Sequence, residues 1–212
     1  MSNNCKSCGA PLASALVCEA CGVLQPAEAP VDPWAALGLP VGFALDARLL
    51  KKRLLALQRR MHPDFFGGAT AEERALSERN TAELNVAEGL LSDDASRADL
   101  LVKRLGGPDE LAERQMPQAF LLEVLEWNEA LDEARTAPPG SPAREALDEL
   151  EQRLSGERRL SLERIARLLD PLPARGAAAL TDVRRELNAV RYLERTLSTL
   201  SKLRLEQARG TR

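Results

Sequence analysis

Aromatic residues, histidine and long apolar runs are scarce in this sequence of 212 residues. Phe, Trp and Tyr together make up only 3% of the chain, which disfavours an all-β sandwich, because strands favour aromatic and β-branched side chains. The single histidine excludes a Ser/His/Asp enzyme with a spare imidazole, and it excludes a multi-histidine metal centre. No run of about 18 apolar residues occurs, so no membrane-spanning helix is expected.

The overall composition favours a helical, globular chain. Hydrophobic residues make up 44% and charged residues 29%, and Leu, Ala, Glu and Arg, which dominate, are good helix formers. The net charge of −3 gives no bulk attraction to nucleic acid. The N-terminal sequence shows no secretory signal, and no Arg/Ser-rich transit segment precedes the first cysteine. We therefore expect a bacterial cytosolic protein, or a mitochondrial matrix protein if the source is eukaryotic.

Four cysteines lie within the first 21 residues, in two C-x-x-C-G repeats: Cys5, Cys8, Cys18 and Cys21. Each repeat can turn two sulfur atoms toward one ion, and two repeats complete the tetrahedral shell of four thiolates that Zn²⁺ prefers. The spacing predicts one structural zinc, which would supply most of the folding energy of so short a segment. Iron fits the same shell, and two disulfides or idle thiols are the alternatives.

The next block predicts a short helical turn at 34–40 and a helix from 46 to 61, capped by Asp46. Apolar residues at spacings of four, three and four residues mark its buried stripe: Leu50, Leu54, Leu57 and Met61. A basic stripe lies nearly opposite: Arg48, Lys52 and Arg59. Taken alone, a basic stripe is typical of a solvated helix face.

The tripeptide His62-Pro63-Asp64 follows this basic helix directly, and a second amphipathic helix is expected from 71 to 91. Pro63 cannot continue a helix, so the tripeptide is predicted in the exposed loop of a helical hairpin. His62 has no second histidine and no evident carboxylate partner for catalysis, and we interpret it as a contact residue, not a general base.

These features resemble the J-domain, and specifically the HscB family of iron–sulfur co-chaperones. The residues that carry the likeness are WAALGLPVGFALD at 34–46, LQRRMHPDFF at 57–66, LNVAEGLLSDDASRADLL at 84–101 and FLLEVLEWNEALDEA at 120–134. Some members of that family also carry an N-terminal tetracysteine segment. Two positions depart from the pattern: Phe65 stands where many J-domains have Lys or Arg, and Asp99 stands where an aromatic residue often precedes Leu-Leu.

The resemblance implies a non-enzymatic co-chaperone that stimulates the ATPase of a DnaK/HscA-type chaperone. It assigns the contact with that chaperone to the HPD loop and the basic stripe: His62, Pro63, Asp64, Arg48, Lys52 and Arg59. It also implies that the chain delivers an IscU-like iron–sulfur scaffold protein to the chaperone.

Turn signals at 106–108, 137–142 and 171–176 separate three further helices, expected at 118–136, 143–170 and 177–207. Short connections between long amphipathic helices predict an antiparallel three-helix bundle. The expected fold is all-α, in four parts. They are a tetracysteine zinc-knuckle segment (1–24), a linker that transmits few contacts (25–32), a J-domain (33–106) and a scaffold-binding three-helix domain (117–207).

The first helix of this bundle has a second apolar face. Leu121, Leu122 and Leu125 lie away from its core seam, beside Glu126, Glu129 and Glu133. This face is either a partner patch or packs on a neighbouring element. On the last helix Tyr192 lies nearly opposite Val183 of the seam, and it either anchors a partner or packs on the adjacent helix. The resemblance places the IscU-like scaffold on both features.

A competing hypothesis is a zinc-knuckle helical protein that binds nucleic acid through its basic helix. The low isoelectric point, about 5.5, and the lack of interleaved basic and aromatic residues disfavour it. An enzyme finds no support, because the sequence shows no nucleophile–base pair, no phosphate-binding loop and no open metal site.

Overall fold

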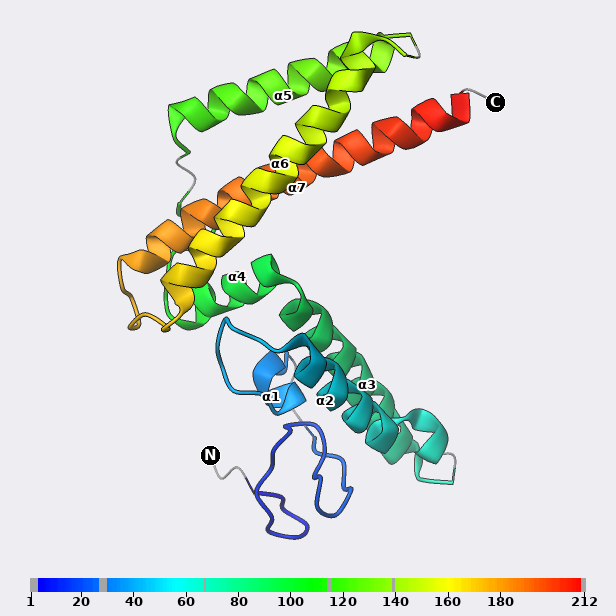
Figure 1. Cartoon of the computed structure of the whole chain (residues 1–212). Coiled ribbons are helices and arrows are strands. Elements are labelled where there is room, and N and C mark those ends of the chain that lie inside the picture. Colours follow the sequence, from blue (N-terminus) through cyan, green and yellow to red (C-terminus); the bar gives the residue numbers. More distant parts are fainter. Residues whose placement is uncertain (1–3, 27–29, 67, 114–115, 139, 211–212) are drawn as a thin grey trace. The chain divides into compact units, whose positions relative to one another are not determined.

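The computed structural model describes the whole chain except residues 1–3, 27–29, 67, 114–115, 139 and 211–212 (Figure 1). It divides into two compact units, Met1–Arg97 and Ala98–Arg212. The secondary structure of the described residues is helical apart from two isolated bridges, Asn4 with Pro11 and Val17 with Leu24. The predicted all-α class is therefore confirmed. Within these residues, no helix combines the length and hydropathy that a bilayer span requires.

The first unit contains helices α1 (Pro33–Leu37), α2 (Ala47–Met61) and α3 (Ala71–Ser92), a 3-10 turn η1 (Pro63–Phe66) and the start of α4 (Asp94–Arg104). Asp46 caps α2 as expected, because its carboxylate accepts hydrogen bonds from the backbone N–H groups of Arg48 and Leu49. Thr70 and Glu73 form a reciprocal capping box at the start of α3. Both caps hold the hairpin that carries the HPD loop.

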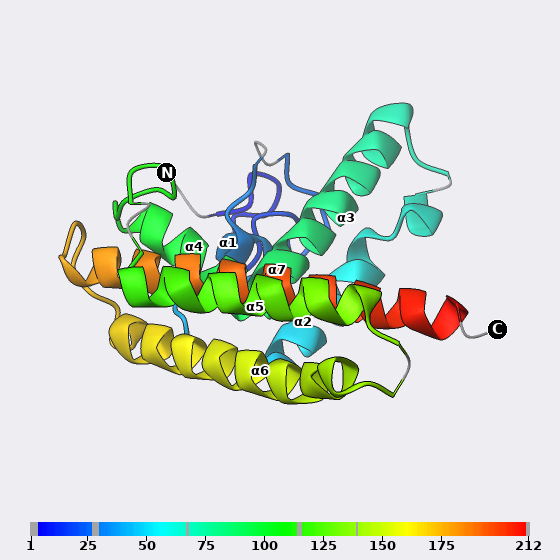
Figure 2. The same ribbon diagram turned by 90° about the horizontal axis from the view of Figure 1, so that it is seen from above.

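The second unit contains the rest of α4 and the helices α5 (Gln118–Thr136), α6 (Pro142–Leu169) and α7 (Ala179–Gly210). Figure 2 shows α5, α6 and α7 running alongside one another. Their shared core is built from leucines around Trp127, including Leu131, Leu154 and Leu193. The three helices agree with the predicted bundle, whereas α4 is a separate helix that was not predicted.

The cysteine segment is part of the first unit. The side-chain amide of Asn80 on α3 donates to the backbone oxygens of Leu16 and Gln25, at 2.8 and 2.9 Å. The hydroxyl of Ser14 donates to the Ala36 oxygen of α1 at 2.6 Å. Leu16, Val17 and Cys18 are fully buried. The expectation that few contacts join the segment to the helices was therefore wrong, because these hydrogen bonds tie it to α1 and α3.

Candidate functional site

The two C-x-x-C-G repeats form matching turns. The N–H of Gly9 donates to the oxygen of Cys5, and the N–H of Gly22 donates to the oxygen of Cys18, both at 2.8 Å. Both glycines have φ in the left-handed region, 74° and 78°, which glycine adopts without steric cost. Each turn therefore presents its two cysteine side chains on one side, as the spacing predicts.

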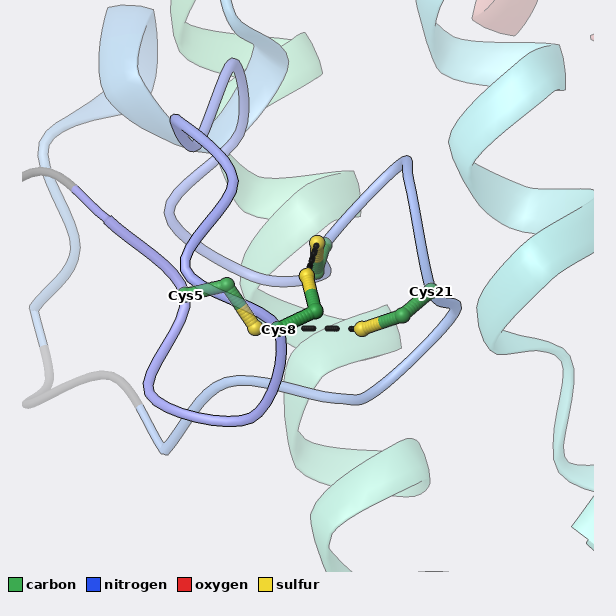
Figure 3. Close-up of side chains that lie close together, drawn as sticks. Cys5, Cys8 and Cys21 are labelled. Atoms are coloured by element: carbon green, nitrogen blue, oxygen red, sulfur yellow. Dashed lines mark hydrogen bonds between the residues drawn. The ribbon is translucent and has the colours of Figure 1, made fainter.

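The sulfur geometry fits a tetrahedral metal ion. All four Sγ atoms lie within 4.8 Å of one another, and Figure 3 shows the side chains of Cys5, Cys8 and Cys21 close together. Cys5 Sγ lies 3.8 Å from Cys21 Sγ, and Cys8 Sγ lies 3.7 Å from Cys18 Sγ. A tetrahedron with metal–sulfur bonds of about 2.3 Å has edges of about 3.8 Å. The cysteines are free thiols, not disulfides.

The environments of Cys5 and Cys18 favour the thiolate form that binds a cation. Backbone N–H groups, first that of Cys8, lower the pKa of the Cys5 thiol to about 6. The N–H of Cys21 likewise lowers the pKa of Cys18. The N–H of Ala10 lowers the pKa of Cys8, but hydrogen bonding with the neighbouring thiols, first that of Cys21, outweighs it and raises this pKa to about 12. Four thiolates would repel one another, and a divalent ion at their centre removes that repulsion.

The HPD loop begins where α2 ends. His62 is the C-terminal cap of α2, and the following residues form the turn η1. The N–H of Asp64 donates to His62 Nδ1 at 3.3 Å, and the Asp64 carboxylate lies 3.5 Å from the same nitrogen. His62 and Asp64 are exposed, and the Phe65 ring stands edge-on to the imidazole, 6.2 Å away. The loop thus presents one imidazole, one carboxylate and one apolar ring to solvent.

The basic residues of α2 divide between two faces. Arg48, Lys52 and Arg59, the predicted stripe, are all exposed. Arg53 and Arg60 instead turn to the cysteine segment, where the Arg53 guanidinium pairs with the Glu19 carboxylate at 2.5 Å. Arg60 donates to the Glu19 backbone oxygen at 2.7 Å. Arg53 is therefore partly withdrawn from the basic surface of α2, whereas Arg60 stays exposed although it bonds to the segment.

The outer face of α5 carries the predicted apolar patch. Leu121, Leu122 and Leu125 are 43%, 53% and 58% exposed. The acidic residues expected beside them are exposed as well: Glu126, Glu129 and Glu133. Leucines exposed to this degree contribute little to the core of the bundle, which suits a face that meets a partner.

Tyr192 on α7 has a mixed environment. It is 39% exposed, and its ring packs edge-to-face on Phe120 of α5 at 5.8 Å. Phe120 in turn packs on Trp127 at 5.6 Å. The tyrosine therefore packs on the adjacent helix and still presents one edge to solvent.

Sequence reasoning missed the polar residues Ser77 and Asn80, both buried on α3. They continue the apolar stripe of Leu84, Ala87 and Leu91 toward the start of the helix at spacings of three and four residues. Polar residues at such core positions must find partners, so the extended stripe was the available signal.

Comparison with known proteins gives consistent results along the chain. A family model described as the HscB C-terminal oligomerisation domain matches residues 116–201. A co-chaperone protein HscB homolog of Ralstonia nicotianae is 35% identical over 164 residues, which are 76% of this chain and 89% of the relative. An HscB homolog of Vibrio vulnificus is 38% identical to this chain over 120 residues, which are 56% of this chain and 68% of the relative. The HscB homolog of Mannheimia succiniciproducens is 38% identical over 104 residues, which are 48% of this chain and 60% of the relative.

Solved structures show the same likeness. The crystal structure of the human co-chaperone protein HscB matches with a TM-score of 0.73 at 25% identity, over 96% of this chain and 98% of the human chain. The chaperone HscB from Vibrio cholerae shares the fold, with a TM-score of 0.67 at 22% identity, over 84% of this chain and 99% of the Vibrio chain. Together with the Ralstonia relative, of which nearly nine-tenths is covered, these matches show that the chain belongs to the HscB family of co-chaperones.

Proposed function

We propose that this chain stimulates the ATPase of a DnaK/HscA-type chaperone and delivers an IscU-like scaffold protein to it during iron–sulfur cluster assembly. The observation that carries the proposal is the exposed His62-Pro63-Asp64 loop at the end of a helix whose outer stripe is basic. A basic stripe steers association toward an acidic partner face. In this role the chain is an adaptor and performs no covalent chemistry.

Each part of the loop has a distinct role in the proposed contact. Asp64 is the exposed anion that competes for an arginine in an ion-pair network of the chaperone. Pro63 fixes φ and so restricts the shapes that the loop can adopt. The stripe of Arg48, Lys52 and Arg59 contributes attraction that falls as the salt concentration rises.

The second half of the proposal concerns the scaffold protein. The exposed leucines and carboxylates of α5 and the exposed Tyr192 of α7 offer both apolar and acidic groups to a partner. Such a face suits a partner with an apolar contact surface and basic residues around it. We propose that the IscU-like scaffold is that partner.

The four thiolates of the first unit are proposed to hold one structural Zn²⁺. Four protein ligands leave no open coordination position, which is typical of structural sites and not of catalytic ones. Elemental analysis of protein purified without added metal should find about one zinc per chain. Iron in its place would change the identity of the metal, and a soluble, reduced protein without metal would refute the site.

The test is ATPase stimulation of a DnaK/HscA-type chaperone with and without the scaffold protein. His62→Gln and Asp64→Asn should abolish stimulation and leave the helical circular dichroism unchanged, because both side chains are exposed. Arg59→Ala should weaken stimulation more than Arg79→Ala, which removes the same charge from an exposed position on α3. Wild-type stimulation by either HPD variant would refute the proposal.

A further inference from the structure

The carbonyl oxygen of Met61, the last residue before the HPD tripeptide, is held by two hydroxyl groups of α3. Ser77 Oγ donates to it at 2.5 Å and Thr81 Oγ1 at 3.3 Å. Ser77 and Thr81 are four residues apart on one helix face, so both reach the same atom. Met61 and Ser77 are both fully buried.

The two hydroxyl groups replace the backbone N–H that would have donated to the Met61 oxygen if the helix had continued. The last carbonyls of a helix lack partners within it. The N–H of Phe65, four residues after Met61, donates instead to the oxygen of His62 at 3.0 Å. A buried carbonyl left without a donor costs free energy, and the hydroxyls of α3 supply the donors here.

The direction of the Ser77 and Thr81 hydrogen bonds is informative. Serine and threonine inside a helix often donate to a carbonyl of their own preceding turn, as Thr196 does to Tyr192 and Thr199 to Arg195 on α7. Ser77 and Thr81 cross to another helix. They therefore fix where the end of α2 lies relative to α3, and the HPD loop starts at that point.

We infer that Ser77 and Thr81 are positioning residues for the HPD loop. They act by holding the Met61 carbonyl, from which the loop departs. Without them the end of α2 samples more positions, and binding a chaperone must then order it. The inference rests on the proposed function for its activity measurement, but not for its spectroscopic one.

The test compares the double variant S77A/T81V, which removes both hydroxyls, with S77A/T81S, which keeps one. The matched control is S92A, because Ser92 also donates a helix hydroxyl to a backbone oxygen, that of Gly89, but within its own helix and at an exposed position. His62 is the only histidine of the chain. Its imidazole C–H signals therefore report the loop in NMR spectra without ambiguity.

The double variant should shift and broaden the His62 signals. It should raise the concentration for half-maximal ATPase stimulation roughly threefold to tenfold, the effect of losing one or two hydrogen bonds. The maximal stimulation should stay near wild type, because the contact residues themselves are intact. S77A/T81S and S92A should lie within about twofold of wild type.

An unchanged half-maximal concentration in folded S77A/T81V overturns the inference, whether or not the His62 signals move. If that variant does not fold, T81V, a nearly isosteric change, replaces it with an expected increase of about twofold. A wild-type protein that fails to stimulate any cognate ATPase refutes the proposed function instead. The His62 signals then decide the positioning role alone: shifted signals support it and unchanged signals overturn it.

Discussion

The Arg53 guanidinium of α2 donates two hydrogen bonds to the Glu19 carboxylate of the cysteine segment, of 2.5 and 3.1 Å. The Nε of Arg53 also donates to the backbone oxygen of Leu37 in α1 at 2.9 Å. The Arg53 side chain thus ties the cysteine segment to α1 and α2. The segment and the HPD hairpin are consequently parts of one folded unit.

Glu19→Gln should make the first unit less stable at neutral pH and less sensitive to acid. The hydrogen bond from Arg53 holds the pKa of Glu19 below its usual range. A lowered folded-state pKa adds stability above the unfolded pKa, about 4.3, and this stability is lost as the pH falls through the folded value. Because the pair is partly exposed, its loss should cost about 1 kcal/mol at pH 7.

Denaturant unfolding of both proteins between pH 7 and pH 3 measures this difference. The difference in the free energy of unfolding between wild type and Glu19→Gln should become smaller as the pH falls. A difference that stays constant over this range would show that the carboxylate charge does not contribute.

Removing the proposed metal ion should destabilise the helices of the first unit, not only the cysteine segment. Leu16 and Val17 are fully buried and Asn80 bonds to two backbone oxygens of the segment, so an unfolded segment leaves apolar surface exposed and Asn80 unpaired. For a unit of this size, a chelator should lower the melting temperature by about 10 °C.

Hydrogen exchange localises the effect of metal removal. The amides of α3 around Asn80 should lose protection on chelation, and those of α6 around Leu154 serve as the reference. Unchanged protection along α3 after metal loss would mean that the segment folds and unfolds independently of the helices.

Much of the helical layout follows from sequence, because apolar periodicity and helix caps are local signals. The predicted helix from 46 to 61 and its Asp46 cap correspond closely to α2. The same logic failed for the cysteine segment. Its contacts, such as Asn80 with Leu16, join residues 64 positions apart, and no local pattern indicates which backbone oxygen a distant amide will meet.

In the second unit, the contact of Asp99 with Arg184 likewise joins residues too far apart in the sequence for a local pattern to predict. Where the family often has an aromatic residue, this chain has a carboxylate, and Arg184 Nη1 lies 2.6 Å from it. Burial raises the pKa of Asp99, but the hydrogen bonds from Lys103 and Arg184 outweigh it and keep this pKa below its usual value. The partner lies 85 residues away, so only the structure explains the substitution.

Arg184→Met should therefore destabilise the second unit strongly. Arg184 is fully buried and also donates to the Pro108 oxygen at 2.9 Å. Its removal therefore takes the buried donor from the Asp99 carboxylate, which keeps the exposed Lys103 at 2.6 Å, and leaves the Pro108 carbonyl without that donor. Breaking such a pair from one side costs about 3–5 kcal/mol. Lys103→Ala, which removes an exposed partner of the same Asp99 carboxylate, should cost less than about 1 kcal/mol. If thermal or denaturant unfolding gave the same loss of stability for both variants, the burial of Arg184 would not explain its contribution.

Truncation of the α5 patch separates binding from stability. Leu121, Leu122 and Leu125 are about half exposed, so the triple alanine variant should keep a melting temperature near wild type. A buried leucine behaves differently: Leu131→Ala, in the core of the same helix, should cost about 2–5 kcal/mol of stability. The two variants therefore form a matched pair on one helix.

The triple variant should keep its basal ATPase stimulation, which the proposed function assigns to the HPD hairpin, and should lose the extra stimulation expected from the scaffold protein. Desolvated leucines at an interface contribute very roughly 1–2 kcal/mol each, so scaffold affinity should fall by at least a hundredfold. Calorimetry at two salt concentrations measures that affinity, and the carboxylates Glu126, Glu129 and Glu133 should add a part that weakens with salt. If instead the triple variant melts far below wild type while the folded fraction binds the scaffold normally, these leucines stabilise the fold and the scaffold binds elsewhere.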